Sequence, residues 1–100
     1  MSPPVITMHA LREKRVDILR LADRWGARNV RVFGSVARGD NPQPGDVDFL
    51  VDFAPDRSLL DHGGFLNDLE ILLGVLVDVV SERGLRPRFR ERVLQEATPL

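Results

Sequence analysis

The 100 residues are 43% hydrophobic with a formal net charge of −1, which is typical of one globular domain over residues 1–100, with residues 1–7 expected to be a flexible N-terminus. The near-zero charge gives no sign of bulk nucleic-acid binding, and the absence of cysteine excludes disulfides, thiol nucleophiles and thiolate metal sites. No apolar run approaches the ~20 residues of a membrane span and no signal-peptide pattern opens the chain, so we expect a cytoplasmic protein.

The first predicted element is a helix that starts near Met8 and stops at Gly26. Thr7 can cap its N-terminus, and glycine is common just after the end of a helix. The apolar residues that recur at helical spacing are Leu11, Ile18, Ala22 and Trp25. Charged residues fill most of the other positions and predict a solvated outer face.

Two strands and a helical turn are predicted next. Residues 29–33 are short and β-branched, residues 35–38 should begin a helical turn, and residues 40–45 are dense in turn formers. Residues 46–53 give the clearest strand, because their side chains alternate between two faces. One face is apolar and should pack against helices; it consists of Val47, Phe49, Val51 and Phe53. The other face is predicted to be wet or functional; it consists of Asp46, Asp48, Leu50 and Asp52.

The remaining chain predicts a helix, a strand and a last helix. Residues 58–61 resemble a capping box that opens a helix ending at Gly74. Gly63 and Gly64 lie inside it, each at a cost of about 1 kcal/mol relative to alanine, so its first turns should be loose. Residues 75–80 predict the third strand, and Pro87 suits the first turn of a helix over residues 87–97.

Three aspartates are the candidate metal ligands. Asp46 and Asp48 point the same way from one strand, where carboxylates can converge on two Mg²⁺ ions. At ~4 Å two bare carboxylates repel by roughly 1 kcal/mol in water and about 4 kcal/mol at an effective dielectric of 20, so the pair calls for a cation or for water. Asp78 interrupts an apolar strand and could join them. Polar residues on edge strands remain the structural alternative for all three.

A glycine-serine turn is the candidate phosphate site. Gly34 follows an apolar strand and lets the backbone approach a phosphate closely, while the Ser35 hydroxyl and the following amides can bind oxyanions. Arg38 lies one turn along and could reach the same phosphates. A plain turn is the alternative, and the segment matches neither a Walker A motif nor a dinucleotide-binding motif.

Together these pieces resemble the DNA polymerase beta-type nucleotidyltransferase superfamily, and within it the minimal nucleotidyltransferases. The resemblance rests on Gly34-Ser35, a gap of ten residues, Asp46-Val47-Asp48 and the later Asp78, together with the end of the chain from Glu96 to Leu100. It covers nearly everything after residue 8. It implies an α+β, two-layer fold in which helices pack on a small mixed sheet.

The resemblance also implies an activity: transfer of a nucleoside monophosphate, usually AMP from ATP, to a hydroxyl, with release of pyrophosphate. Asp46, Asp48 and Asp78 match the catalytic carboxylates that bind two Mg²⁺ ions, and Asp78 matches the one that also acts as general base. Gly34 and Ser35 match the phosphate-binding turn. Minimal members often act as antitoxins beside HEPN-domain toxins, and some adenylylate the toxin.

The sequence also allows other functional classes. A non-catalytic antitoxin could block its partner by contact alone. The arginine-rich segment from Arg83 to Arg92 could be a solvated helix face or a docking patch for an acidic partner or RNA, although we expect no direct nucleic-acid binding. Self-association is neither predicted nor excluded by the apolar strand faces.

Overall fold

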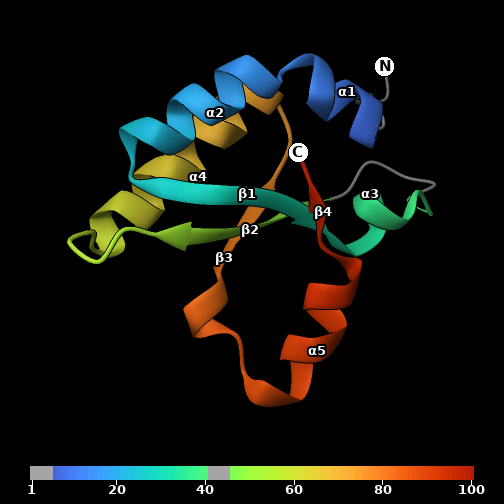
Figure 1. Cartoon of the computed structure of the whole chain (residues 1–100). Coiled ribbons are helices and arrows are strands. Elements are labelled where there is room, and N and C mark those ends of the chain that lie inside the picture. The colour runs from blue at the N-terminus through green and yellow to red at the C-terminus, as the bar shows by residue number, and fades with distance from the viewer. Residues whose placement is uncertain (1–5, 41–45) are drawn as a thin grey trace.

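A computed structural model describes residues 6–40 and 46–100, so the predicted N-terminal tail and the loop over 40–45 fall largely outside the described residues. Helices and strands alternate along the chain (Figure 1). In order they are α1 (Met8–Glu13), α2 (Arg15–Arg24), β1 (Ala27–Phe33), α3 (Gly34–Arg38), β2 (Val47–Phe53), α4 (Leu59–Leu73), β3 (Val77–Ser81), the 3₁₀ turn η1 (Glu82–Gly84), α5 (Pro87–Glu96) and β4 (Thr98–Pro99).

The four strands form one mixed sheet in the order β3-β2-β1-β4. β1 runs antiparallel to both β2 and β4, whereas β2 and β3 are parallel. A parallel pair needs a crossover, and α4 supplies it between β2 and β3. This arrangement confirms the predicted α+β architecture. The two-residue β4 was not predicted, because so short a segment carries no alternation signal.

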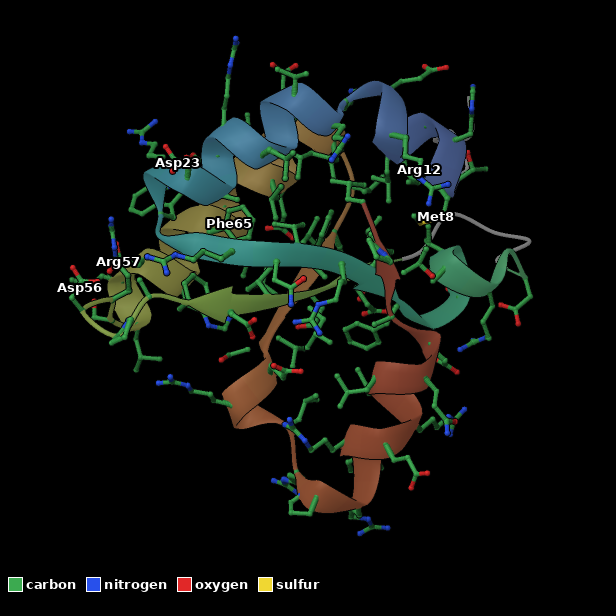
Figure 2. The ribbon with its side chains drawn as sticks, viewed as in Figure 1. Met8, Arg12, Asp23, Asp56, Arg57 and Phe65 are labelled. Atoms are coloured by element: carbon green, nitrogen blue, oxygen red, sulfur yellow. The ribbon has the colours of Figure 1, made fainter. Side chains whose placement is uncertain are left out.

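One face of the sheet lies beneath α1, α2 and α4, while η1 and α5 extend on the other side (Figure 1). The predicted apolar face of β2 is confirmed, since Val47, Phe49 and Val51 are fully buried. Phe65 of α4 is also fully buried and lies between the helices and the sheet (Figure 2). None of the helices within the described ranges is long and apolar enough to cross a membrane.

The second face of β2 is not uniformly wet, which corrects the sequence-based expectation. Leu50 lies on this face and is fully buried. Strand register places it between Arg31 of β1 and Val80 of β3. Alternation along one strand revealed which residues share a face, but the neighbours that cover Leu50 come from distant segments.

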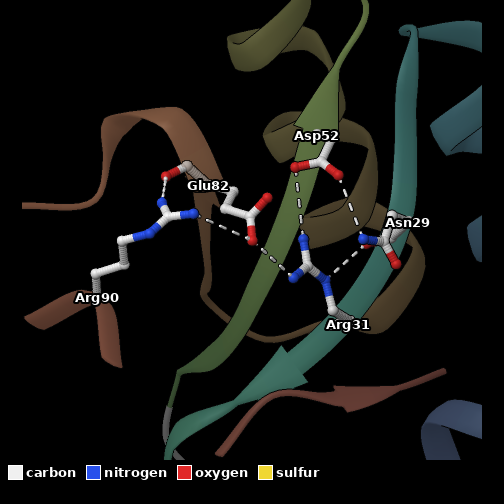
Figure 3. A network of polar contacts seen from close by, with 5 residues as sticks. All are labelled: Asn29, Arg31, Asp52, Glu82 and Arg90. Carbon is white, nitrogen blue, oxygen red and sulfur yellow. Dashed lines mark hydrogen bonds and ion pairs between the residues drawn. The ribbon is translucent and has the colours of Figure 1, made fainter. Parts of the chain in front are cut away.

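Arg31 is the buried cation on this second face, with 9% of its surface exposed (Figure 3). Its Nη2 lies 3.5 Å from Asp52 Oδ1, its Nη1 lies 3.4 Å from Glu82 Oε1, and its Nε donates to the Asn29 carbonyl at 3.0 Å. Arg90 of α5 donates to the Glu82 carbonyl at 3.2 Å. Because a buried charge needs partners, this network joins η1 and α5 to the sheet.

The single helix predicted from Met8 to Gly26 is wrong in one respect, because it is divided at Lys14. Lys14 departs from helical geometry with φ −100° and ψ 13°. Its ammonium donates to the Leu72 carbonyl at 3.3 Å, at the far end of α4. Leu11 and Ile18 are both fully buried on either side of the break. Helical periodicity survives a one-residue break, so the apolar pattern did not indicate it.

The glycine pair in α4 has a packing explanation. The predicted capping box at Ser58 and Asp61 is present, and α4 is helical from Leu59 to Leu73 with both glycines inside it. A Cβ on Gly64 would overlap the Trp25 ring, whereas a Cβ on Gly63 would meet nothing within 4 Å. Trp25 is further held by its Nε1, which donates to Asp68 Oδ2 at 2.8 Å. Gly64 therefore lets α2 and α4 approach closely.

These two glycines predict opposite substitution effects. Gly64→Ala should lower the free energy of unfolding by about 1–3 kcal/mol, because the methyl group forces the Trp25 ring to move. Gly63→Ala should raise it by up to about 1 kcal/mol, because only helix propensity changes. Urea denaturation followed by tryptophan fluorescence measures both variants. Equal effects of the two substitutions would contradict the packing explanation.

Candidate active site

Asp48 and Asp78 lie side by side at the centre of the candidate site. They are register partners in the parallel β2–β3 pair, so their side chains leave the sheet on the same face. Asp48 is half-buried and Asp78 is exposed on an edge strand. Asp46 precedes β2 by one residue and is exposed. Asp78 thus lies on an edge strand, as expected if it were only a solvent-facing polar residue. The same strand position also places it next to Asp48.

The electrostatics of Asp48 depart from those of an ordinary surface aspartate. Partial burial, and then the neighbouring charges of Asp78 and Asp46, raise the pKa of Asp48 to about 6. Arg38 acts in the opposite direction, and Glu96 adds to the rise. A carboxylate that is hard to ionise beside two others favours a bound cation, because a cation offsets the repulsion.

The glycine-serine turn lies directly against Asp48. Phe33, the last residue of β1, is the register partner of Asp48, and Gly34 then opens α3 with φ +75°. A Cβ on Gly34 would overlap Asp48 Oδ2 and would lie 3.3 Å from Asp48 Cγ. Glycine is therefore required for two reasons, the positive φ and the close approach of the carboxylate. Ser35 follows it as the second residue of α3.

Arg38 ends α3 and is held by two carboxylates. Its Nε donates to Asp40 Oδ2 at 2.9 Å and its Nη1 donates to Glu96 Oε1 at 3.0 Å. The hydrogen bond to Asp40, and then that to Glu96, raise the pKa of Arg38. No sequence pattern assigned Glu96 a role of its own. It lies 58 positions from Arg38, so only the path of α5 in the folded chain brings the two together.

Comparison with known proteins identifies the family of the chain. The family model for the nucleotidyltransferase domain matches residues 18–100. The chain belongs to the nucleotidyltransferase family. A solved structure provisionally assigned as a minimal nucleotidyltransferase is 55% identical, with a TM-score of 0.84 over 95% of this chain and 97% of that one.

Two further relatives carry more specific descriptions. Protein adenylyltransferase MntA of Thermococcus cleftensis is 42% identical to this nucleotidyltransferase in the matched region. The match covers 76% of this chain and 77% of MntA. A toxin–antitoxin complex crystallised with AMP-PNP contains a chain with a TM-score of 0.71. That match covers 84% of this chain and 69% of the other, and at 20% identity it supports the fold alone.

The carboxylates of this nucleotidyltransferase fit Mg²⁺ by their chemistry. Mg²⁺ takes oxygen ligands, and carboxylates usually hold it together with water and substrate phosphates. Across residues 6–40 and 46–100, no three histidine, cysteine, aspartate or glutamate side chains are grouped closely enough to hold a metal ion by themselves. Asp48 and Asp78 thus offer an adjacent pair, with Asp46 nearby, and nucleotide oxygens and water would complete the coordination.

The arginine-rich segment runs from η1 to α5, and one of its members, Arg92, lies against Glu96 of the site just described. Arg90 Nη2 lies 3.9 Å from Glu82 Oε1, and Arg92 Nε lies 3.7 Å from Glu96 Oε1. Arg86 and Arg88 are exposed, and Arg88 stacks on Phe89 at 5.0 Å from the ring centre. Part of the segment therefore serves internal ion pairs rather than a free docking patch.

Proposed function

We propose that this nucleotidyltransferase is a protein adenylyltransferase that moves AMP from ATP to a hydroxyl on a partner protein, as the antitoxin of a toxin–antitoxin pair. The observation that carries the proposal is the contact of the Gly34 turn with Asp48, which is itself paired with Asp78. It is supported by the similarity to protein adenylyltransferase MntA and by the fold shared with the complex that holds AMP-PNP.

In the proposed reaction the acceptor oxygen bonds to the α-phosphorus of ATP, and the bond from that phosphorus to the β-phosphate oxygen breaks. Asp46, Asp48 and Asp78 would hold two Mg²⁺ ions, which supply charge neutralisation for the triphosphate and the leaving pyrophosphate. The turn at Gly34 and Ser35 binds phosphate oxygens through its amides and hydroxyl. Asp78 accepts the proton that leaves the acceptor hydroxyl.

The exposure of Asp78 supports a macromolecular acceptor. Asp78 and Asp46 both face solvent, so a hydroxyl carried by another protein has access to the general base. We propose a HEPN-type toxin as that partner, from the resemblance of the chain to minimal nucleotidyltransferases. Whether this protein also self-associates is a separate question, which size measurement of the purified chain answers.

The test is an incubation of the purified complex with labelled ATP and Mg²⁺, followed by mass spectrometry of both chains. We expect the partner to gain the mass of one or more adenylyl groups on hydroxyl side chains, with pyrophosphate released in equal amount. A partner that is inhibited yet acquires no label would instead indicate an antitoxin that acts by contact alone. Omission of Mg²⁺ is the matched control.

A further inference from the structure

Glu96 is the least exposed member of an ion-pair cluster that joins the end of α5 to the candidate phosphate site. Its side chain is 21% exposed, compared with 41% for Arg38 and 58% for Asp40. Its carboxylate accepts from Arg38 Nη1 at 3.0 Å, and Arg92 Nε lies 3.7 Å away. The contact between Glu96 and Arg38 thus fixes an arginine that would otherwise extend from a helix of only five residues.

The backbone around Glu96 is firmly anchored. The Thr98 hydroxyl donates to the Glu96 carbonyl at 3.2 Å, and Thr98 is the register partner of Val32 in β1. One residue after Val32, β1 ends at Phe33, where Gly34 begins the turn. The chain next to Glu96 and the glycine-serine turn are therefore both attached to β1. This shared attachment gives the Glu96 carboxylate a defined position relative to the candidate site.

Glu96 and Asp40 together leave one part of the Arg38 guanidinium available. Nε and Nη1 are engaged, whereas Nη2 makes no hydrogen bond to any residue in the described part of the chain. Arg38 also ends the five-residue helix that Gly34 opens, so its guanidinium is carried by the same short element as the glycine-serine turn. A guanidinium held on two of its nitrogens loses little further side-chain freedom when the third binds an oxyanion.

We propose that Glu96 is a positioning residue, which holds Arg38 in place to bind the phosphates of the nucleoside triphosphate. This inference rests on the proposed function, since it concerns the same nucleotide. The positioning role can nevertheless be tested apart from the transfer reaction, because nucleotide affinity can be measured without an acceptor protein. The opposite role is a latch, in which Glu96 competes with phosphate for Arg38 and restrains binding.

The sign of the effect of Glu96→Gln separates these two roles. Glu96 carries a negative charge near a site for a polyanion, so removing the charge should by itself tighten nucleotide binding. If Glu96 positions Arg38, its neutralisation should instead weaken binding, because the charge-assisted hydrogen bond that holds the guanidinium is lost. A loss of affinity therefore cannot arise from the through-space charge of Glu96.

The experiment is a calorimetric titration of the full chain with AMP-PNP and Mg²⁺. We expect Glu96→Gln and Arg38→Ala each to raise the Kd by about tenfold, the effect of losing one such interaction. The double variant should lose no more than Arg38→Ala alone, because both substitutions remove the same interaction. Glu91→Gln is the matched control, because it removes the same charge from an exposed position of α5 and should leave the Kd unchanged.

Three results would overturn the inference. Tighter binding in Glu96→Gln would assign the latch role, and an unchanged Kd would leave Glu96 without a role in nucleotide binding. Fully additive losses in the double variant would mean that Glu96 does not act through Arg38. If instead the affinities behave as expected while no adenylyl group reaches a partner, the proposed transfer fails and the positioning role stands.

Discussion

Asp48→Asn is expected to abolish nucleotidyl transfer while the domain remains folded. Asparagine keeps the shape of the side chain but loses the negative charge that would hold Mg²⁺ beside the phosphates. Metal-assisted charge stabilisation amounts to several kcal/mol, so transfer should fall on the order of 10³-fold or more. Asp46→Ala and Asp48→Ala should also abolish it. The measurement is the initial rate of label transfer from ATP to the co-purified partner.

The same substitution should stabilise the metal-free protein at neutral pH. The folded-state pKa of Asp48 is about 6, above its ordinary value of 3.8, so the folded state binds the proton more tightly. Wild-type stability is therefore higher below pH 4 and falls as the pH rises through 6. Because half-exposed charges are screened by solvent, we expect a gain of only about 1 kcal/mol for Asp48→Asn at pH 7, absent at pH 4.

Asp52→Asn is the matched control for this prediction. Asp52 lies two positions beyond Leu50 on the same face of β2, but it contacts Arg31 and Asn29 rather than the candidate site. We expect Asp52→Asn to retain transfer and to lose a little stability, the reverse of Asp48→Asn. Wild-type transfer by Asp48→Asn, or a stability gain that persists at pH 4, would contradict the assigned role of Asp48.

Gly34→Ala should reduce both stability and transfer. A residue other than glycine at φ +75° carries a cost of roughly 1–2 kcal/mol, and the new methyl group would overlap the Asp48 carboxylate. The carboxylate must then leave its position beside Gly34, which changes how it is placed relative to the glycine-serine turn and Asp78. We expect transfer to fall by about 10²-fold, the loss typical of a misplacement of ~1 Å in a catalytic group.

Gly39→Ala separates the effect of backbone strain from the effect of the overlap with Asp48. Gly39 has nearly the same backbone conformation, with φ +76°, but a Cβ there would meet nothing within 4 Å. It should therefore show the loss of stability from backbone strain alone and keep most of its transfer activity. Urea denaturation and the label-transfer assay measure the two properties. Equal losses of transfer in both variants would mean that the overlap with Asp48 is unimportant.

Local chemistry made much of the fold predictable from the sequence. Alternation in residues 46–53 identified the buried face of β2, and the capping box at Ser58 located the start of α4 within one residue. Helical spacing revealed the buried stripe of α1 and α2 but not the break at Lys14, because the stripe is continuous across it. The break coincides with a contact between Lys14 and the Leu72 carbonyl of α4, which no local pattern records.

The candidate site also combines features that the sequence predicts with features that depend on the folded chain. The sequence by itself determined which residues are the candidates for the chemistry: Gly34 and Ser35 after an apolar strand, Asp46 and Asp48 on one face, and Asp78 within an apolar run. Only the tertiary structure decided which of them meet. The parallel pairing of β2 with β3 aligns Asp78 with Asp48, and the β1–β2 register brings Gly34 against the same carboxylate. Arg38 and Glu96 meet only through the path of α5. The physical reason is that side-chain type and periodicity are properties of neighbours along the chain, whereas strand register and helix placement are set by packing between distant segments.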